Sequence, residues 1–291
     1  MEEEKYIKKA YKCGTCALYD YENKRCTFTP PYYVEFELDD LGNPICRYHS
    51  SKKTKALTGG FYYEMKKRQK VFFIGDLHFG HLNIINHHPQ RATEAGISFA
   101  DFKENPKECN EKHDKWLIEL WNKTVSKEDT VYILGDFCLK NKEYAENILK
   151  QLKGKKFFIN GNHDKAIKGL ENYFEWVGDI KEVKFTNNQF KFISPDETFC
   201  IELCHYPMLT WNRRPHGSCM VHGHCHGSID KCNEDMNELR VDVGLDGKLS
   251  NYHFIELEEL YNYFCKIRDN YGCKTFQEFI DKRMKELGYR A

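Results

Sequence analysis

Short hydrophobic segments that end at side chains able to bind a metal ion recur along this 291-residue chain. Buried strands typically appear as apolar and aromatic runs followed by a turn, as at residues 71–74, 130–134, 157–160, 199–204 and 218–222. The donors that follow these runs are Asp76, His78, Asp136, Asn162, His205, His224 and His226. A lone Gly-Asn-His-Asp segment could be a surface turn. Its recurrence instead indicates a site at the carboxyl edge of a sheet, where ligands and catalytic groups gather.

The first part of this region alternates strands with helices. One helix is expected near 108–124, where Trp116, Leu117, Leu120 and Trp121 fall at helical spacing, and another near 141–152. This βαβ alternation predicts a sheet with helices packed on both faces.

Beyond residue 174 the hydrophobic runs are shorter and typical of strands. We expect strands at 176–177, 180–185, 190–193, 199–204, 219–222, 239–243 and 252–257, the last three completing a second sheet. Two amphipathic helices after residue 258 should pack on the same domain. The prediction is an α/β fold, an α+β sandwich of two packed mixed β-sheets flanked by helices. It assigns 71–257 to the main domain and 258–291 to a C-terminal helical extension.

Residues 1–50 contain several cysteines and few aliphatic residues. In Cys13-Gly14-Thr15-Cys16 both thiolates can face one ion, and Cys26 and Cys46 would complete a tetrahedral structural zinc site. Such an ion would stabilise a module that has too few apolar residues for its own core. The irregular spacing leaves unliganded cysteines as the alternative and does not exclude iron. A protein partner could dock on this cysteine-rich module.

Residues 51–70 are rich in lysine and arginine, with Phe61, Tyr62 and Tyr63 among them. One interpretation is a solvated basic linker. The other is a patch that follows a phosphate backbone and stacks on bases, which would suit a polynucleotide substrate.

Overall composition narrows the class of protein. Basic and acidic residues balance at 44 each, so net charge gives no argument for nucleic acid or membrane as a partner. The chain opens on Glu2-Glu3-Glu4 and has no apolar run of membrane-spanning length, so we expect a soluble, cytoplasmic protein. The 13 cysteines are an odd number in a long chain, which favours reduced thiols over disulfides. Those in or beside predicted strands, Cys138, Cys200, Cys204 and Cys219, are expected in the core.

The seven strand-end donors are too many for one ion. Carboxylate, imidazole and amide ligands suit manganese, iron or zinc better than calcium. Two divalent ions about 4 Å apart, bridged by one carboxylate, would use the whole set.

In order along the chain, these motifs resemble those of the calcineurin-like metallophosphoesterases. The resemblance covers about residues 71–257 and rests on Asp76-Leu77-His78, Gly135-Asp136, Gly161-Asn162-His163-Asp164, His205 and Gly223-His224-Cys225-His226. Segments 79–85 and 204–208 are also similar to a small group of predicted phosphoesterases from bacteria and phages. A bacterial or phage-infected cell is therefore the expected setting.

The resemblance implies a role for each matching residue. Asp76, His78 and His226 would hold one metal, Asn162, His205 and His224 the other, and Asp136 would bridge them. His163 would stabilise charge on the phosphate or protonate the leaving oxygen, and Asp164 would orient His163. The implied enzyme hydrolyses a phosphodiester or phosphomonoester, expected to be nucleotide-derived, with a metal-activated water.

Some residues near these motifs have two interpretations. Arg213 and Arg214 could fork onto a phosphate or be surface charges. His81 and Asn83 could contact substrate or cap the following helix. The histidines outside the motifs, His87, His88, His113, His216, His222 and His253, are expected to be structural.

Two kinds of observation distinguish the competing functions: where the sequence departs from the family pattern, and which of the family's residues it retains. Phe137-Cys138 follows Gly135-Asp136 in place of the acidic and arginine residues of Ser/Thr protein phosphatases, which argues against that activity. A nuclease acting on DNA or RNA is the alternative suggested by residues 1–70. A binding scaffold without catalysis could have lost His163 or a ligand, and this chain keeps them all.

Overall fold

The computed structural model describes residues 69–286 and residue 288, together with four short strands before them. The chain divides into two compact units, Met1–Arg68 and Gln69–Ala291. In the first unit, β1 (Tyr19–Asp20) pairs antiparallel with β2 (Arg25–Cys26), and β3 (Glu37–Leu38) pairs antiparallel with β4 (Pro44–Ile45). The predicted zinc ligands Cys13, Cys16 and Cys46, the side chain of Cys26, and residues 51–68 of the basic linker lie outside the described residues.

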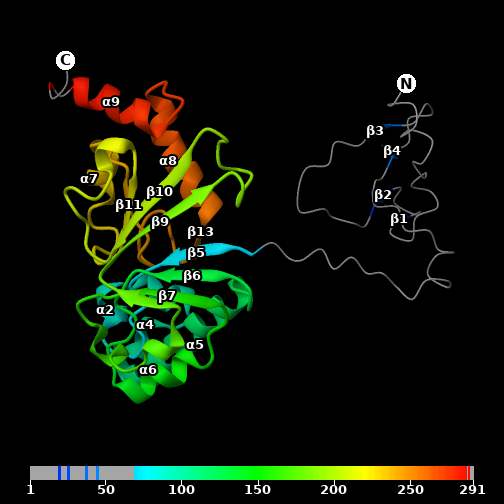
Figure 1. Cartoon of the computed structure of the whole chain (residues 1–291). Coiled ribbons are helices and arrows are strands. Elements are labelled where there is room, and N and C mark those ends of the chain that lie inside the picture. Colours follow the sequence, from blue (N-terminus) through cyan, green and yellow to red (C-terminus); the bar gives the residue numbers. More distant parts are fainter. Residues whose placement is uncertain are drawn as a thin grey trace. The chain divides into compact units, whose positions relative to one another are not determined.

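The first sheet of the second unit has the strand order β13-β5-β6-β7-β8 (Figure 1). Its strands are β13 (Ile255–Glu256), β5 (Val71–Ile74), β6 (Thr130–Ile133), β7 (Lys155–Ile159) and β8 (Trp176–Gly178). The pairs from β5 to β8 are parallel, and β13 is antiparallel to β5. All four residues of β5 are buried because both faces of the sheet are covered. The carboxyl ends of the parallel strands therefore meet along one edge.

One face of this sheet packs on helices. The helices on this face are α5 (Pro106–Thr124) and α6 (Lys142–Leu149). The short helices α2 (Ile84–His87), α3 (Gln90–Glu94) and α4 (Phe99–Glu104) form a separate buried cluster with Cys109 of α5. Phe72 and Ile74 of β5 join a core with Leu117 and Trp121 of α5 and with Ile148 of α6. The predicted spacing of Leu117 and Trp121 is thus confirmed as a buried helix face.

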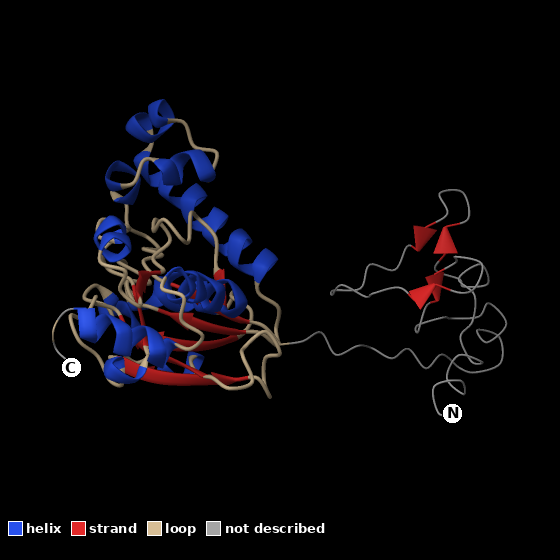
Figure 2. Cartoon of the chain, turned by 90° about the horizontal axis from the view of Figure 1, so that it is seen from above, coloured by secondary structure: helices blue, strands red, loops and turns tan. Residues whose placement is uncertain are grey.

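The second sheet has the order β12-β11-β10-β9 and is also mixed. Its strands are β12 (Arg240–Asp242), β11 (Cys219–His222), β10 (Thr198–Cys204) and β9 (Ile180–Thr186). β9 and β10 are antiparallel, whereas β10, β11 and β12 are parallel. The short elements around these strands are η3 (Asp164–Ile167), η4 (Glu171–Tyr173), η5 (Arg214–His216) and α7 (Asp230–Asp235). Figure 2 shows the strands and helices from above.

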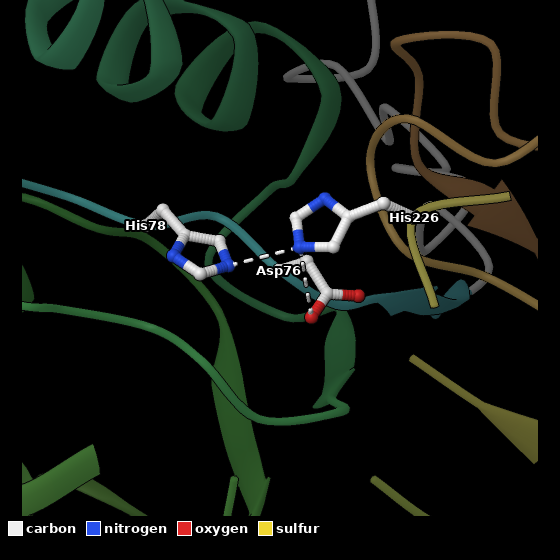
Figure 3. A group of neighbouring side chains, drawn as sticks. All are labelled: Asp76, His78 and His226. Atoms are coloured by element: carbon white, nitrogen blue, oxygen red, sulfur yellow. Dashed lines mark hydrogen bonds and ion pairs between the residues drawn. The ribbon is translucent and has the colours of Figure 1, made fainter. Parts of the chain in front are cut away.

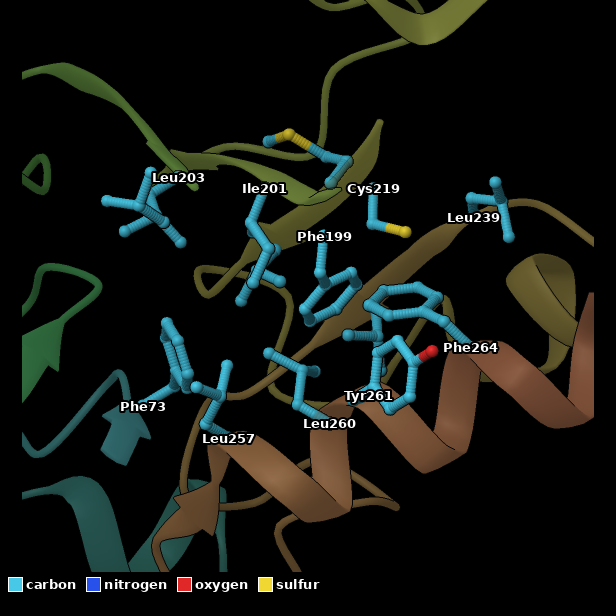
Figure 4. Packing of buried hydrophobic residues seen from close by; sticks show 14 of the residues in the cluster. Phe73, Phe199, Ile201, Leu203, Cys219, Leu239, Leu257, Leu260, Tyr261 and Phe264 are labelled. Carbon is cyan, nitrogen blue, oxygen red and sulfur yellow. The ribbon is translucent and has the colours of Figure 1, made fainter. Parts of the chain in front are cut away.

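A second core joins both sheets to the C-terminal helices α8 (Leu257–Asn270) and α9 (Phe276–Glu286). Phe73 of the first sheet, Ile201 of the second and Leu260 of α8 belong to this cluster, and Figure 4 shows them with Phe199 and Phe264. Truncating a buried phenylalanine of this kind typically costs about 3–5 kcal/mol. The predicted α/β fold, two mixed sheets flanked by helices, is confirmed. The buried cysteines Cys138, Cys200, Cys204 and Cys219 are core residues, as predicted.

Two strand predictions are wrong. Residues 190–193 form no strand: the Phe190 amide donates to the Thr186 carbonyl, and the Asn187 side chain donates to the Ile193 carbonyl, which together curl the chain into turns. The strand expected at 252–257 covers only 255–256, and it belongs to the first sheet, where Ile255 pairs with Phe73. It covers the edge of β5 that β6 does not pair.

In the part of the chain that the structure describes, no helix has both the length and the apolar character needed to cross a bilayer.

Candidate metal centre

The seven predicted donors follow strands of both sheets. Backbone hydrogen bonds fix the first two loops against each other, because the amides of Asp76 and His78 donate to the carbonyls of Gly135 (3.0 Å) and Asp136 (2.9 Å). The His224 amide, from the loop after β11, donates to both carboxylate oxygens of Asp76 at 3.0 and 2.9 Å. These bonds connect the loop ends of the two sheets at one place.

One group of donors consists of Asp76, His78 and His226, whose ligand atoms all lie within 4.8 Å of one another (Figure 3). The two histidines approach through their Nε2 atoms, which are 3.2 Å apart. Nε2 of His226 is also 3.9 Å from Oδ1 of Asp76. The three side chains therefore point toward a common position.

A second group consists of Asp136, His205 and His224, again with ligand atoms within 4.8 Å of one another. The amide oxygen of Asn162 lies 3.0 Å from Nε2 of His205, and Oδ1 of Asp136 lies 3.6 Å from the same nitrogen. The structure thus places all four of these predicted residues together.

Asp136 connects the two groups. While its Oδ1 faces His205, its Oδ2 lies 3.6 Å from Nε2 of His78 in the first group. Its side chain is only 3% exposed, so neither oxygen depends mainly on bulk water for a partner. A buried carboxylate with one oxygen toward each group has the geometry that a bridging ligand requires.

In two of the histidines, a hydrogen bond at the ring nitrogen that faces away from the site determines which nitrogen carries the proton. Nδ1 of His205 lies 2.7 Å from the Leu134 carbonyl oxygen, which can only accept, so this nitrogen carries the proton. Nδ1 of His226 likewise lies 2.7 Å from Oδ2 of Asp246. When these rings are neutral, each Nε2 carries a lone pair that is directed at the other donors of its group. These are the tautomers that metal-binding histidines need.

Burial makes the site favour a cation. Burial, followed by the nearby Asp242 and Asp136, raises the pKa of Asp76 well above its ordinary value. Burial, followed by Arg91, holds the pKa of His78 far below its ordinary value, so that ring is neutral. Crowded carboxylates and neutral imidazole lone pairs repel one another unless positive charge lies between them. The oxygen and nitrogen donor set fits a divalent metal ion.

The backbone at these donors is unusual. Asp76, His78, Asp136, His224 and His226 all have positive φ angles, of 55°, 55°, 51°, 69° and 49°. Residues other than glycine rarely adopt this left-handed region, and such strain clusters at functional sites. The surrounding hydrogen bonds hold the loops in conformations that aim consecutive side chains at one position.

His163 lies at the exposed side of the first group, with its ring centroid 6.0 Å from that of His78. Its side chain is 49% exposed, and its Nε2 is 4.0 Å from Oδ2 of Asp136. Its backbone amide donates to Oδ1 of the same carboxylate at 3.0 Å. The imidazole is therefore close to the donors and open to solvent.

Asp164 acts on the loops rather than on the His163 ring, which corrects the predicted orienting role. Its oxygens accept from the backbone amides of Asp136, Phe137 and Gly161, each at 2.7 Å. Burial raises the pKa of Asp164 to about 6. Because these amides belong to the loops after β6 and β7, Asp164 positions Asp136 and Asn162 relative to each other.

Comparison with known proteins agrees with this geometry. The sequence model of the calcineurin-like phosphoesterase family matches residues 69–241, which contain all seven donors and His163. The chain belongs to the calcineurin-like phosphoesterase family. Its members are phosphoesterases, so metal-dependent hydrolysis of phosphate esters is the activity that the family and the clustered ligands indicate.

The names of three similar proteins do not identify a substrate. An uncharacterized protein of Methanocaldococcus jannaschii is 26% identical over 193 residues, 65% of this chain and 88% of the relative. The gene 66 protein of Mycobacterium phage L5 is 24% identical over 230 residues, 70% of this chain and 99% of the relative. The crystal structure of a protein of unknown function from Aquifex aeolicus is 24% identical, covers 67% of this chain and 99% of its own, and has a TM-score of 0.48.

A buried pair outside the predicted motifs, Arg91 and Asp246, supports His226. Nε of Arg91 donates to Asp246 at 2.8 Å, and its other nitrogens donate to the carbonyls of Leu77 (3.0 Å) and Asp76 (2.6 Å). Although burial alone would raise the pKa of Asp246, hydrogen bonds from Arg91 and His226 hold it below its ordinary value. Asp246 could have been found, because it follows the predicted strand at 239–243. Nothing in the sequence around Arg91 marks it.

Two histidines predicted to be structural lie close to the phosphoesterase site. The His88 ring stacks on that of His226, with centroids 4.3 Å apart, and groups with His226 and Asp246. His222 is fully buried and groups with Cys225 and Asp242. His88 therefore contacts a metal-ligand candidate, and its structural role stays a prediction.

The four predicted substrate contacts divide into two pairs. His81 lies beside His78, with ring centroids 5.3 Å apart, and burial, followed by His87, lowers its pKa to about 4. Asn83 is the N-cap residue of α2, as the capping alternative predicts, but its side chain makes no capping hydrogen bond and instead contacts that of His87 at 3.4 Å.

The second pair consists of Arg213 and Arg214. Arg214 donates to both oxygens of Glu238 at 3.1 Å and lies over the Trp211 ring, so its guanidinium is already engaged. Arg213 is exposed and directly precedes η5. The phosphate fork is therefore wrong for Arg214.

Proposed function

We propose that this chain is a dinuclear metal-dependent phosphoesterase that hydrolyses a phosphodiester or phosphomonoester, nucleotide-derived in its natural form. The observation that carries the proposal is the position of Asp136, with one carboxylate oxygen 3.6 Å from His78 and the other 3.6 Å from His205. A carboxylate placed between two donor groups can bridge a cation held by each of them.

The ligand sets follow the two groups. Asp76, His78 and His226 would hold one ion, Asn162, His205 and His224 the other, and Asp136 would bridge. Manganese suits this mixture of oxygen and nitrogen donors, and iron or zinc would also fit. When bound, two such ions supply charge neutralisation for the phosphate and lower the pKa of a water toward neutrality.

His163 supplies what the ligand sets lack. Hydrolysis leaves an alkoxide that needs a proton or a positive neighbour, and an imidazole can provide either near neutral pH. The His163 ring is half exposed, so a substrate entering from solvent can reach it. Its amide is bonded to Asp136, which keeps the ring next to the ligand groups. His163 therefore holds or gives the proton at the leaving oxygen.

The test compares His163→Gln with the wild type, both loaded with manganese, on a panel of nitrophenyl phosphate esters and nucleotides. On the nucleotides, which release an alkoxide, we expect turnover to fall by about 10²–10⁴-fold, the range for a lost general acid, with metal content unchanged. The nitrophenyl esters, whose leaving group needs no proton, should lose less. His253→Gln is the matched control, because His253 is 48% exposed and pairs with Glu259 at the surface. A wild type that hydrolyses nothing on the panel, or a His163→Gln enzyme as fast as wild type, would contradict the proposal.

A nuclease remains the second candidate. The observation that favours it is the basic and aromatic composition of residues 51–70. Binding of DNA or RNA that weakens steeply with salt and is lost on deleting residues 1–68 would support a polynucleotide substrate. The absence of such binding would exclude a nuclease.

A further inference from the structure

An exposed aromatic ring lies against the second donor group. Tyr206 follows His205 at the end of β10 and is 45% exposed. Its ring centroid lies 4.7 Å from that of His224 and 5.0 Å from that of His205, inclined at 63° and 73°. Isolated exposed apolar residues are common on protein surfaces and need no explanation. Tyr206 differs because it touches two metal-ligand candidates.

The segment that carries Tyr206 is fixed at two points. The buried Arg240 donates to the Met208 carbonyl at 2.8 Å. Trp211 is buried, and its indole nitrogen donates to the Ser218 carbonyl at 3.0 Å. Between these anchors Leu209 is 83% exposed. The chain thus holds Tyr206 in place and presents a second apolar side chain to solvent on the same segment.

Such a surface beside the ligand groups suits the organic part of a substrate. A phosphate held by the two donor groups would have its ester substituent next to Tyr206, a position where a planar aromatic group can stack. Stacking of a base on an aromatic side chain strengthens binding and does not depend on base identity.

We infer that Tyr206 is a specificity-determining residue that binds the aromatic base of a nucleoside phosphate, with Leu209 extending the apolar surface. This inference rests on the proposed phosphoesterase function and defines its substrate class. The competing role is structural, in which Tyr206 only orients the imidazoles of His205 and His224. The two roles differ in one respect: a base-binding ring affects only substrates that have a base.

The experiment uses the full-length manganese-loaded protein and two substrates that differ only in the base, adenosine 5′-monophosphate and ribose 5-phosphate. Methyl esters of the same two compounds serve if the enzyme prefers diesters. The measured quantity is the ratio of kcat/KM for the substrate with the base to that without it. Tyr206→Leu should lower this ratio about tenfold, corresponding to 1.4 kcal/mol of stacking. Tyr206→Phe, which keeps the ring, should retain the wild-type ratio.

Phe99→Leu is the matched control, because Phe99 is an aromatic residue of α4 that is 42% exposed and belongs to neither donor group. It should leave the ratio unchanged. A wild-type ratio in Tyr206→Leu would overturn the inference, even if both rates fell together, because an equal loss is what a structural role predicts.

Equilibrium binding separates this inference from the proposed function. If the wild type hydrolyses none of these esters, the catalytic proposal fails, and the affinities for adenosine 5′-monophosphate and ribose 5-phosphate decide the inference. Tighter binding of the nucleotide that Tyr206→Leu abolishes would support it. Equal affinities in the wild type would overturn it.

Discussion

The Nε2 atoms of His78 and His226 lie 3.2 Å apart, although 148 positions separate the two residues in the chain. His78 follows the first strand of one sheet, and His226 follows a strand of the other. The proton on Nδ1 of His226 belongs to the contact with Asp246, so its Nε2 offers a lone pair. Because the two sheets bring these ring nitrogens so close together, we infer that both sheets contribute ligands to one metal ion at this position.

Asp246→Asn tests whether the partner of His226 matters for that ligand. The amide cannot keep the charge that the buried Arg91 and the His226 proton both contact. Loss of such an outer partner typically weakens metal affinity about 10–100-fold, and titration with manganese or zinc would measure it. Glu259→Gln is the control, because Glu259 makes a comparable contact with His253 at 3.0 Å on the surface. Unchanged affinity in Asp246→Asn would rule out the supporting role.

Asp136→Asn distinguishes a bridging carboxylate from an ordinary ligand. If Asp136 serves both groups, we expect this variant to lose two metal ions per chain relative to wild type, whereas His224→Ala should lose one. Elemental analysis of the dialysed proteins gives both differences, and any ion bound outside this site cancels in the comparison. Loss of the same number of ions from the two variants would argue against bridging.

Gly135→Ala should disrupt the close approach of three loops. Gly135 has a φ of +84°, and a Cβ there would lie 2.5 Å from Nδ1 of His205 and 2.8 Å from the Gly161 backbone. We expect the free energy of unfolding to fall by about 3 kcal/mol from backbone strain and overpacking together. Gly272→Ala is the control, since its φ is +66° but no atom lies within 4 Å. It should cost only about 1 kcal/mol. Urea unfolding of both variants measures the difference, and equal losses would contradict the crowding.

His113 gives a pH dependence that is independent of the metal ligands. It is fully buried on α5, and burial lowers its pKa below 6.5 despite the hydrogen bond with Asp114. Below pH 6.5 the unfolded chain therefore binds a proton that the folded chain does not, and wild-type stability falls as the pH drops.

His113→Leu removes this proton uptake. The difference in free energy of unfolding between wild type and variant should then be smaller at pH 5.5 than at pH 7.5. Urea unfolding at the two pH values measures the change. A difference that stays constant with pH would mean that His113 titrates alike in both states.

Local patterns in the sequence were enough to predict the strand ends and the donors they carry. Asp136 and Asn162 follow hydrophobic runs whose burial needs no long-range information. The role of Asp164 was not predictable, because its three amide partners lie on two loops that meet only in the folded chain. Arg91 had no signal for the same reason, since its partner Asp246 is 155 residues away. The pairing of Ile255 with Phe73 likewise depends on which sheet edge is free.

Anomalous diffraction from crystals of the manganese-loaded protein tests the central claim most directly. The account predicts two manganese peaks about 4 Å apart, one among Asp76, His78 and His226, the other among Asn162, His205 and His224, with Asp136 between them. A single peak, or two peaks that Asp136 does not join, would contradict a dinuclear phosphoesterase.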